Sequence, residues 1–452
     1  MRRVLPVLLF MQGALASSCD AEPLVLPIRD VQVLSENKES YMRGIAAQVG
    51  TPPQNVVLLP WAYVQYLKAG GAPNETIFTG SVYGIKNLPE RSIGAIDKLK
   101  LEGAVELSEF PFGIPTSNWD DSHTTLSVLG LGRNSTYLNA LRKAEQITSR
   151  VWSIFWGRFG DEEPMDGSLV LGGYDKTKVT GKNYTAPLIY DHFDASQGCW
   201  TGMRVTVTDI KINFVGGTNA SIFSSETALH FCINPAHHLL MEAPTDYIDK
   251  FESITGIDAS RSTTDLHWMA PQTNVERKIF TGDLTFYLES GLEVRVPNHQ
   301  FVFPATDIDK DGSRVYNVSR QNILINSVED EAPVLGRYFF TAAYLMVNQD
   351  AGTFTLWKAN VTEESKPVRV FDEQTGEKCG DKASGVIQPS ASSTGPTSGP
   401  DGNSDSHRAD HSPSGSMIGG AIAGSVIGVA VIAAGVYCFL YRKRKQASKS
   451  IV

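Results

Sequence analysis

Residues 50–68 read GTPPQNVVLLPWAYVQYLK, and the interpretation of the whole chain starts from this stretch. A turn signal, Gly-Thr-Pro-Pro, opens it, because glycine and proline interrupt regular structure more strongly than other residues. The apolar run VVLLP at 56–60 follows at once and predicts a short buried strand. The chain then enters a loop that begins with Trp61, Ala62 and Tyr63.

Turns and short apolar runs of this kind alternate along most of the chain. Helical periodicity is sparse, with amphipathic segments only at 135–147 and 246–256. We therefore expect a mainly β fold. The segments predicted as strands are 56–60, 96–101, 168–173, 204–212, 283–288 and 353–359.

The two ends of the chain carry targeting patterns. Residues 1–16 join two arginines, an apolar stretch and the small-x-small site Ala14-Leu15-Ala16, which predicts a signal peptide. Residues 417–441 are uncharged and long enough to span a bilayer as a helix, and a basic cluster follows them. The expected protein is single-pass type I, with residues 442–452 as its cytoplasmic tail.

The segment before the predicted membrane helix has a different composition. Residues 381–416 are rich in Ser, Gly and Pro and nearly free of apolar side chains, so we expect a flexible stalk. Within the helix, Gly420, Gly424 and Gly428 repeat at four-residue spacing, which is typical of dimerising membrane helices. A homodimer through this face is an expectation, beside the alternative that glycine is simply common in such helices.

The charge distribution and the cysteines indicate an extracellular or lumenal ectodomain. The formal net charge is −9, and basic residues cluster in the leader and tail, so the ectodomain is acidic and nucleic acid is not an expected partner. Four of the five cysteines lie in the ectodomain, which predicts two disulfides in an oxidising compartment. Three pairings are open; we favour Cys199–Cys232, which closes a local loop, and Cys19–Cys379.

Several shorter patterns add to this description. We expect glycosylation at six Asn-x-Ser/Thr sequons. The segment DIDKDG at 307–312 lacks the acid that a calcium loop needs, and predicts a hairpin turn. His237 and His238 are expected on a surface turn, and the sequence predicts neither a metal site nor a cofactor. The sequons are at Asn74, Asn134, Asn183, Asn219, Asn317 and Asn360.

Four ordered features resemble the pepsin-like aspartic peptidases. They are the opening stretch with its preceding strand (41–55), the step Val-Leu-Gly-Leu at 128–131, the segment GSLVLGGYDKTKVTG at 167–181, and the step Val-Leu-Gly-Arg at 334–337. The resemblance covers nearly all of residues 40–360. It implies a bilobal, mainly β fold with an N-terminal lobe at 17–190 and a C-terminal lobe at 191–380.

The resemblance also implies a pair of catalytic aspartates, which this chain lacks. The family places one aspartate per lobe in a D-[TS]-G-[TS] loop, and the two carboxylates share a proton. In the first lobe the aspartate position aligns with Trp61. In the second lobe we align the loop with Ser224, Ser225, Glu226 and Thr227, so that Ser224 takes the aspartate position.

The expected function is therefore that of a non-catalytic relative, a cell-surface binding or structural glycoprotein. Its expected ligand is a peptide, a glycan or a protein in the groove between the lobes, where Trp61 would either stack on the ligand or fill the groove. The alternative is an aspartic-type endopeptidase with an atypical active site. The candidate groove residues are Trp61, Tyr63, Ser224, Ser225, Glu226 and Thr227.

Overall fold

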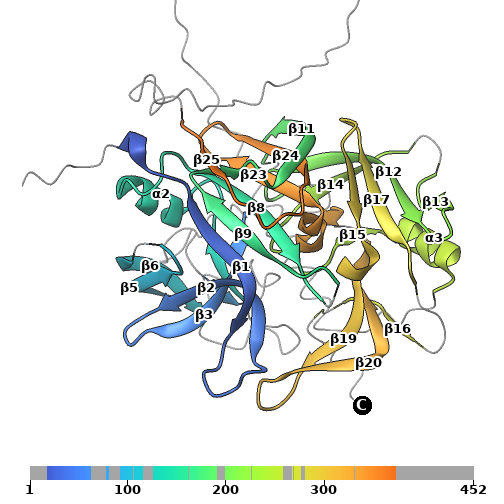
Figure 1. The fold of residues 1–452 in the computed structure, drawn as a ribbon, viewed down its shortest axis with the longest axis horizontal. Helices are drawn as coiled ribbons and strands as arrows, with labels where there is room; N and C mark the ends of the chain where they lie inside the picture. Colours follow the sequence, from blue (N-terminus) through green and yellow to red (C-terminus); the bar gives the residue numbers. More distant parts are fainter. Residues whose placement is uncertain are drawn as a thin grey trace, which may run out of the picture. The chain divides into compact units, whose positions relative to one another are not determined.

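The structure is a computed structural model, and Figure 1 shows its fold. No helix in the described part of the chain is long and apolar enough to cross a membrane. The predicted leader, stalk, membrane helix and tail lie outside that part, as do Asn74 and Cys379. The described residues are 18–62, 78–80, 92–104, 106–115, 126–160, 162–190, 199–224, 227–257, 267, 269–275, 280–329 and 331–372.

A 12-stranded sheet forms the largest element of the fold (Figure 1). Its strand order is β11-β24-β23-β8-β9-β1-β2-β3-β7-β4-β6-β5. The bounds are β1 Leu24–Gln32, β2 Tyr41–Val49, β3 Gln54–Trp61, β4 Phe78–Gly80, β5 Ser92–Leu101, β6 Leu107–Pro115, β7 Leu126–Gly130, β8 Val151–Arg158, β9 Met165–Leu171, β11 Val179–Pro187, β23 Ala343–Asn348 and β24 Thr353–Ala359.

Strands from both predicted lobes share this sheet. β23 and β24 come from the predicted C-terminal lobe, yet β23 pairs with β8 and β24 pairs with β11. β8, with the sequence VWSIFWGR, is buried along nearly its whole length because it has a neighbour on each side and packed layers on both faces. The lobe boundary near residue 190 therefore does not divide the sheets.

An eight-stranded sheet follows the order β18-β17-β12-β14-β22-β15-β21, and β13 pairs with β12 outside this path. β12, with the sequence RVTVTDIKIN, alternates buried and more exposed residues, as a strand with one face on the core should. The bounds are β12 Arg204–Asn213, β13 Asn219–Ser221, β14 Leu229–Ile233, β15 Met241–Pro244, β17 Asp283–Leu288, β18 Glu293–Val296, β21 Ile325–Val328 and β22 Val334–Leu335.

Two small sheets and a few helical segments complete the described fold. β10 (Gly173–Asp175) pairs with β25 (Pro367–Arg369), and a three-stranded sheet has the order β16-β20-β19. The fold is mainly β with few helices, as predicted. The remaining bounds are β16 Gln272–Asn274, β19 Val302–Ile308, β20 Arg314–Ile323, α2 Thr136–Lys143, α3 Thr245–Thr255 and the 3-10 segments η1 Ser18–Asp20, η3 Asn298–Gln300 and η4 Arg337–Thr341.

Both predicted helices are present, and local chemistry sets their ends. α2 begins after Ser135, whose Oγ accepts a hydrogen bond from the backbone N–H of Leu138 at 3.1 Å. α3 ends at Gly256, which has a φ of 66° in the left-handed region that glycine tolerates.

The predicted turn at 307–312 joins β19 to β20, and residues of this hairpin contact the segment between β1 and β2. Tyr316 Oη lies 2.6 Å from Tyr41 Oη, and the Arg314 guanidinium lies 4.2 Å from the centroid of the Tyr41 ring. Asn37 Nδ2 donates to Asp311 O at 3.0 Å. These contacts join parts of the chain that are far apart in sequence, and we call them the hairpin contact.

Candidate functional site

The loop of the first lobe begins where β3 ends. β3 runs parallel to β7, with Trp61 opposite Gly130. The carbonyl of Trp61 accepts a hydrogen bond from the backbone N–H of Leu131 at 2.8 Å. Residues 128–131 thus hold the end of β3 in a fixed register. This register places Trp61 at the start of the loop.

The Trp61 side chain is buried. Only 6% of it is exposed, and it belongs to the main hydrophobic core together with Ala62. An indole that packs among apolar side chains stabilises the fold through the area that it removes from water. Tyr63, the next candidate residue, lies outside the described part of the chain.

The second lobe repeats this arrangement at a different place from the one that the sequence predicts. β14 runs parallel to β22, with Cys232 opposite Val334 and Ile233 opposite Leu335. The backbone N–H of Asn234 donates to Leu335 O at 2.9 Å, just beyond the last pair. In both lobes, then, a strand end runs beside a Val-Leu-Gly step, and Asn234 is the residue that corresponds to Trp61.

The glycine of the second step is required by packing. A Cβ on Gly336 would lie 2.1 Å from Leu239 O and 2.9 Å from His237 Cδ2. No side chain fits at such distances, because one of the contacts is a backbone oxygen that cannot move alone. The close approach of residue 336 to the segment after Asn234 therefore fixes the shape of the second loop.

The register corrects the predicted role of Ser224. Ser224 is exposed and lies before β14, where its carbonyl accepts from Thr227 Oγ1 at 2.9 Å, whereas the loop that matches the first lobe follows β14. The alignment failed because Ser224, Ser225 and Thr227 imitate the hydroxyls of the family loop. Ser225 and Glu226 lie outside the described residues.

The side chain of Asn234 is held by a hydrogen bond within its own loop. It is 9% exposed, and its Oδ1 accepts a hydrogen bond from the backbone N–H of Ala236 at 3.1 Å. An amide does not titrate near neutral pH, so this side chain cannot act as a general acid or base. A sequence signal for this position does exist, since the apolar residues 231–233 precede Asn234 as 56–60 precede Trp61.

The loop after Asn234 buries two titratable groups. His237 is 4% exposed, which corrects the prediction of a surface turn, and Glu242 is 7% exposed. His237 Nε2 lies 3.5 Å from Glu242 Oε2. Burial, and then the charge of Glu331, raise the pKa of Glu242 to about 8.

Burial acts on His237 in the opposite direction. It lowers the pKa of His237 well below the usual value, and the charges of His238 and Arg337 lower it further. Both members of the pair are therefore uncharged near pH 7. In the described part of the chain no group of three or more His, Cys, Asp or Glu side chains could hold a metal ion.

Arg337 holds the same loop through its backbone carbonyls. Its guanidinium donates to His237 O at 3.1 Å and to Ala236 O at 2.8 Å, and it lies 5.5 Å from the centroid of a Trp156 ring. Hydrogen bonds from a charged donor are stronger than neutral ones, especially when they are buried. The loop is thus fixed by backbone contacts and carries no ionised carboxylate of its own.

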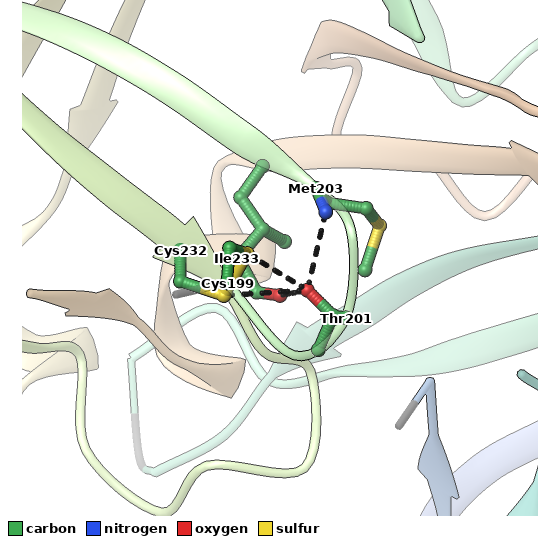
Figure 2. The surroundings of a disulfide bond; sticks show 5 residues. All are labelled: Cys199, Thr201, Met203, Cys232 and Ile233. Atoms are coloured by element: carbon green, nitrogen blue, oxygen red, sulfur yellow. Dashed lines mark hydrogen bonds between the residues drawn. A yellow bond between two sulfur atoms is a disulfide. The ribbon is translucent and has the colours of Figure 1, made fainter. Parts of the chain in front are cut away.

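A disulfide fastens the strand that leads into the second loop. Cys199 and Cys232 form the predicted bond. Figure 2 shows Thr201 beside it, with Oγ1 donating to Ile233 O at 2.6 Å and accepting from the backbone N–H of Met203 at 3.4 Å. Cys19 is also in a disulfide, and its predicted partner Cys379 lies outside the described residues.

Comparison with known proteins points to one family. Residues 122–359 match the family model of eukaryotic aspartyl proteases. The crystal structure of an aspartic proteinase from Irpex lacteus is similar at 16% sequence identity and a TM-score of 0.46. That similarity covers 76% of this chain and 99% of the other chain. Among curated proteins the search finds no match.

Proposed function

The chain belongs to the eukaryotic aspartyl protease family, and from this premise we propose that it is a non-catalytic, membrane-anchored member that acts as a surface glycoprotein. The equivalent positions of Trp61 and Asn234 carry this proposal. The chemistry of the family needs two carboxylates that share a proton and activate water. An indole and an amide stand at the two strand ends where those carboxylates would be.

The buried carboxyl of Glu242 does not replace the missing pair. It is uncharged near pH 7, because its pKa is raised to about 8, and its near neighbour is the imidazole of His237. A peptidase with an atypical site would need an accessible carboxylate at each of two facing positions. Glu242 is buried and is a single carboxyl group, so it does not meet this requirement. We assign it a structural role.

The burial of Trp61 favours a structural role over ligand binding between the lobes. An indole that is 6% exposed packs in the core and leaves almost none of its face for stacking on a peptide or a sugar. We therefore propose a structural surface glycoprotein in which the former catalytic loops contribute to the core. The signal-peptide pattern at 1–16 and the uncharged apolar run at 417–441 support the anchored, type I arrangement.

The test is a cleavage assay on the full-length protein in detergent. A broad peptide library is incubated with it from pH 3 to pH 7, with and without a transition-state inhibitor of aspartic peptidases, beside an active member of the family. We expect no cleavage and no binding of the inhibitor at any pH. Cleavage that the inhibitor blocks would overturn the proposal.

A further inference from the structure

The open edges of the sheets are of two kinds. One carries charged side chains, which prevent pairing with another strand. This edge is β18, at one end of the eight-stranded sheet, with Glu293 and Arg295. β5, the last strand in the order of the 12-stranded sheet, is not an open edge, because it pairs with both β6 and β2.

The second kind of edge carries a sequon. β11 lies at the other end of the 12-stranded sheet and pairs, among the described strands, with β24 alone. Asn183 is exposed and lies where the register between β11 and β24 is interrupted, between Thr180 and Tyr184. The irregularity and the neighbouring Lys182 hinder a further strand at this point, whereas residues 184–186 of the same edge carry no charged side chain.

β13 repeats this situation in the eight-stranded sheet. Among the described strands it pairs only with β12, and its first residue is the exposed Asn219. The turn that joins the two strands contains Val215, which is 83% exposed. An apolar side chain at the tip of a short edge hairpin favours association with another chain unless something covers it.

β20 supplies the third case. β16 pairs with residues 320–322 of this strand, the backbone N–H of Val275 donates to Ser319 O, and the backbone N–H of Arg314 donates to Glu39 O. Asn317 therefore lies in the short stretch 315–318, which pairs, among the described strands, with β19 alone. Val318, the middle residue of the sequon, is 75% exposed. Val215 and Val318 have the highest exposure of the large apolar residues in the described part of the chain.

The side chain of Asn317 is oriented by its own sequon. Its Oδ1 accepts hydrogen bonds from the backbone N–H of Ser319 at 3.1 Å and from Ser319 Oγ at 2.6 Å. The amide nitrogen, to which an N-linked sugar attaches, takes no part in these bonds. Asn360 differs, because its Nδ2 donates to Thr177 O at 2.7 Å, and Asn134 differs because it is only half-exposed beside the start of α2.

We propose that N-linked glycans at Asn183, Asn219 and Asn317 cover the open sheet edges of β11, β13 and β20 and prevent strand pairing between copies of this protein. The glycans have the same role at these edges that charge has at β18. The inference rests on one part of the proposed function, the passage of the chain through the secretory pathway, and not on the absence of catalysis.

The experiment uses the full-length protein, expressed in a glycosylating host and placed in lipid nanodiscs at one copy per disc. Glycopeptide mass spectrometry first measures occupancy, which we expect at Asn183, Asn219 and Asn317. Association between discs is then followed by light scattering. The test variant changes these three residues to Gln, and a control variant carries Asn134→Gln and Asn360→Gln. These remove one sequon before α2 and one at the end of β24, on the paired side of β11.

A third variant separates edge protection from a general effect of sugar. It changes Asn183, Asn219 and Asn317 to Lys, so it lacks the glycans but places charge on the same edges. We expect association between discs that carry the Gln variant, whereas discs that carry the wild type, the Lys variant or the control remain separate.

The remaining outcomes overturn the inference. Empty sequons at the three positions in the wild type would do so, as would a Gln variant that stays single. Association of the Lys variant to the same degree would exclude edge pairing as the cause. Each of these results leaves the cleavage assay, and with it the non-catalytic assignment, unaffected. Only a chain with no occupied sequon at all would also argue against the glycoprotein part of the proposed function.

Discussion

Trp61 and Asn234 hold equivalent backbone positions and are used in different ways. The indole fills space in the core, whereas the amide caps its own loop through Ala236. Neither role needs a charge, and both place the side chain where an ionised carboxylate would be desolvated. At the scale of single residues, therefore, the titratable pair that matters for stability is His237 with Glu242.

Glu242 is expected to make the protein less stable as the pH rises. The folded state keeps the carboxyl proton up to a pKa of about 8, whereas the unfolded chain releases it near 4.5. Between these two values the unfolded state is favoured progressively, so the contribution of Glu242 to stability is greatest below the lower value and falls until about pH 8. Glu242→Gln removes this fall, because an amide cannot ionise.

The measurement is the free energy of unfolding in urea at pH 5 and pH 8. Between pH 5 and pH 8 the free energy of unfolding of the wild type should fall relative to that of Glu242→Gln by at most roughly 4 kcal/mol, at about 1.4 kcal/mol per pKa unit. Glu109→Gln, at an exposed position of β6, is the matched control and should show no such gain. Parallel pH profiles for wild type and Glu242→Gln would contradict the prediction.

At the scale of elements, each of the six segments predicted as strands coincides with a strand of the structure, and the prediction failed at one loop. Runs such as 204–212 and 353–359 have the period and composition of strands within a few residues, and α2 and α3 have the period of helices. The position of Asn234 depends on the pairing of β14 with β22, about a hundred residues further on in the chain. The apolar residues 231–233 are only a weak local signal for such a register, and Asn234-Pro235-Ala236 keeps none of the family's loop residues.

The disulfide at β14 gives a prediction for this element. Cys199→Ala together with Cys232→Ala opens a loop with a sequence separation of 33. Loop-closure entropy in the unfolded chain then destabilises the protein by roughly 3–4 kcal/mol. Urea unfolding measures this loss. Cys438→Ala, in the predicted membrane helix, is the matched control, and an unchanged midpoint in the double variant would argue against the prediction.

At the scale of the whole molecule, the hairpin contact connects the β1–β2 segment with the β19–β20 hairpin. Burial and the hydrogen bond with Tyr316 raise the pKa of Tyr41 to about 12. Arg314 contributes both its backbone, which donates to Glu39 O at 3.0 Å, and its side chain, whose Nη2 donates to Tyr41 O at 2.9 Å. One arginine thus contacts two residues of the first lobe.

Arg314→Ala is expected to loosen this connection. The loss of a charged hydrogen bond and of a cation–π contact should lower the free energy of unfolding by about 2 kcal/mol. Limited proteolysis should also cut sooner in the turn 309–313. Arg320→Ala, on the same strand but exposed and at 3.4 Å from Gln272 Oε1, serves as the control. Equal cleavage rates in both variants would show that the contact does not restrain the hairpin.

The pairing of β11 with β24 also determines when these two strands can come together during synthesis. Thr185 and Thr355, whose hydroxyls lie 2.9 Å apart, are separated by 170 residues along the chain. At about 5–20 residues per second, β24 leaves the ribosome roughly 10–30 s after β11. Throughout that interval the nascent chain holds a finished strand with no partner, and the sheet closes only when translation has nearly reached the predicted membrane segment.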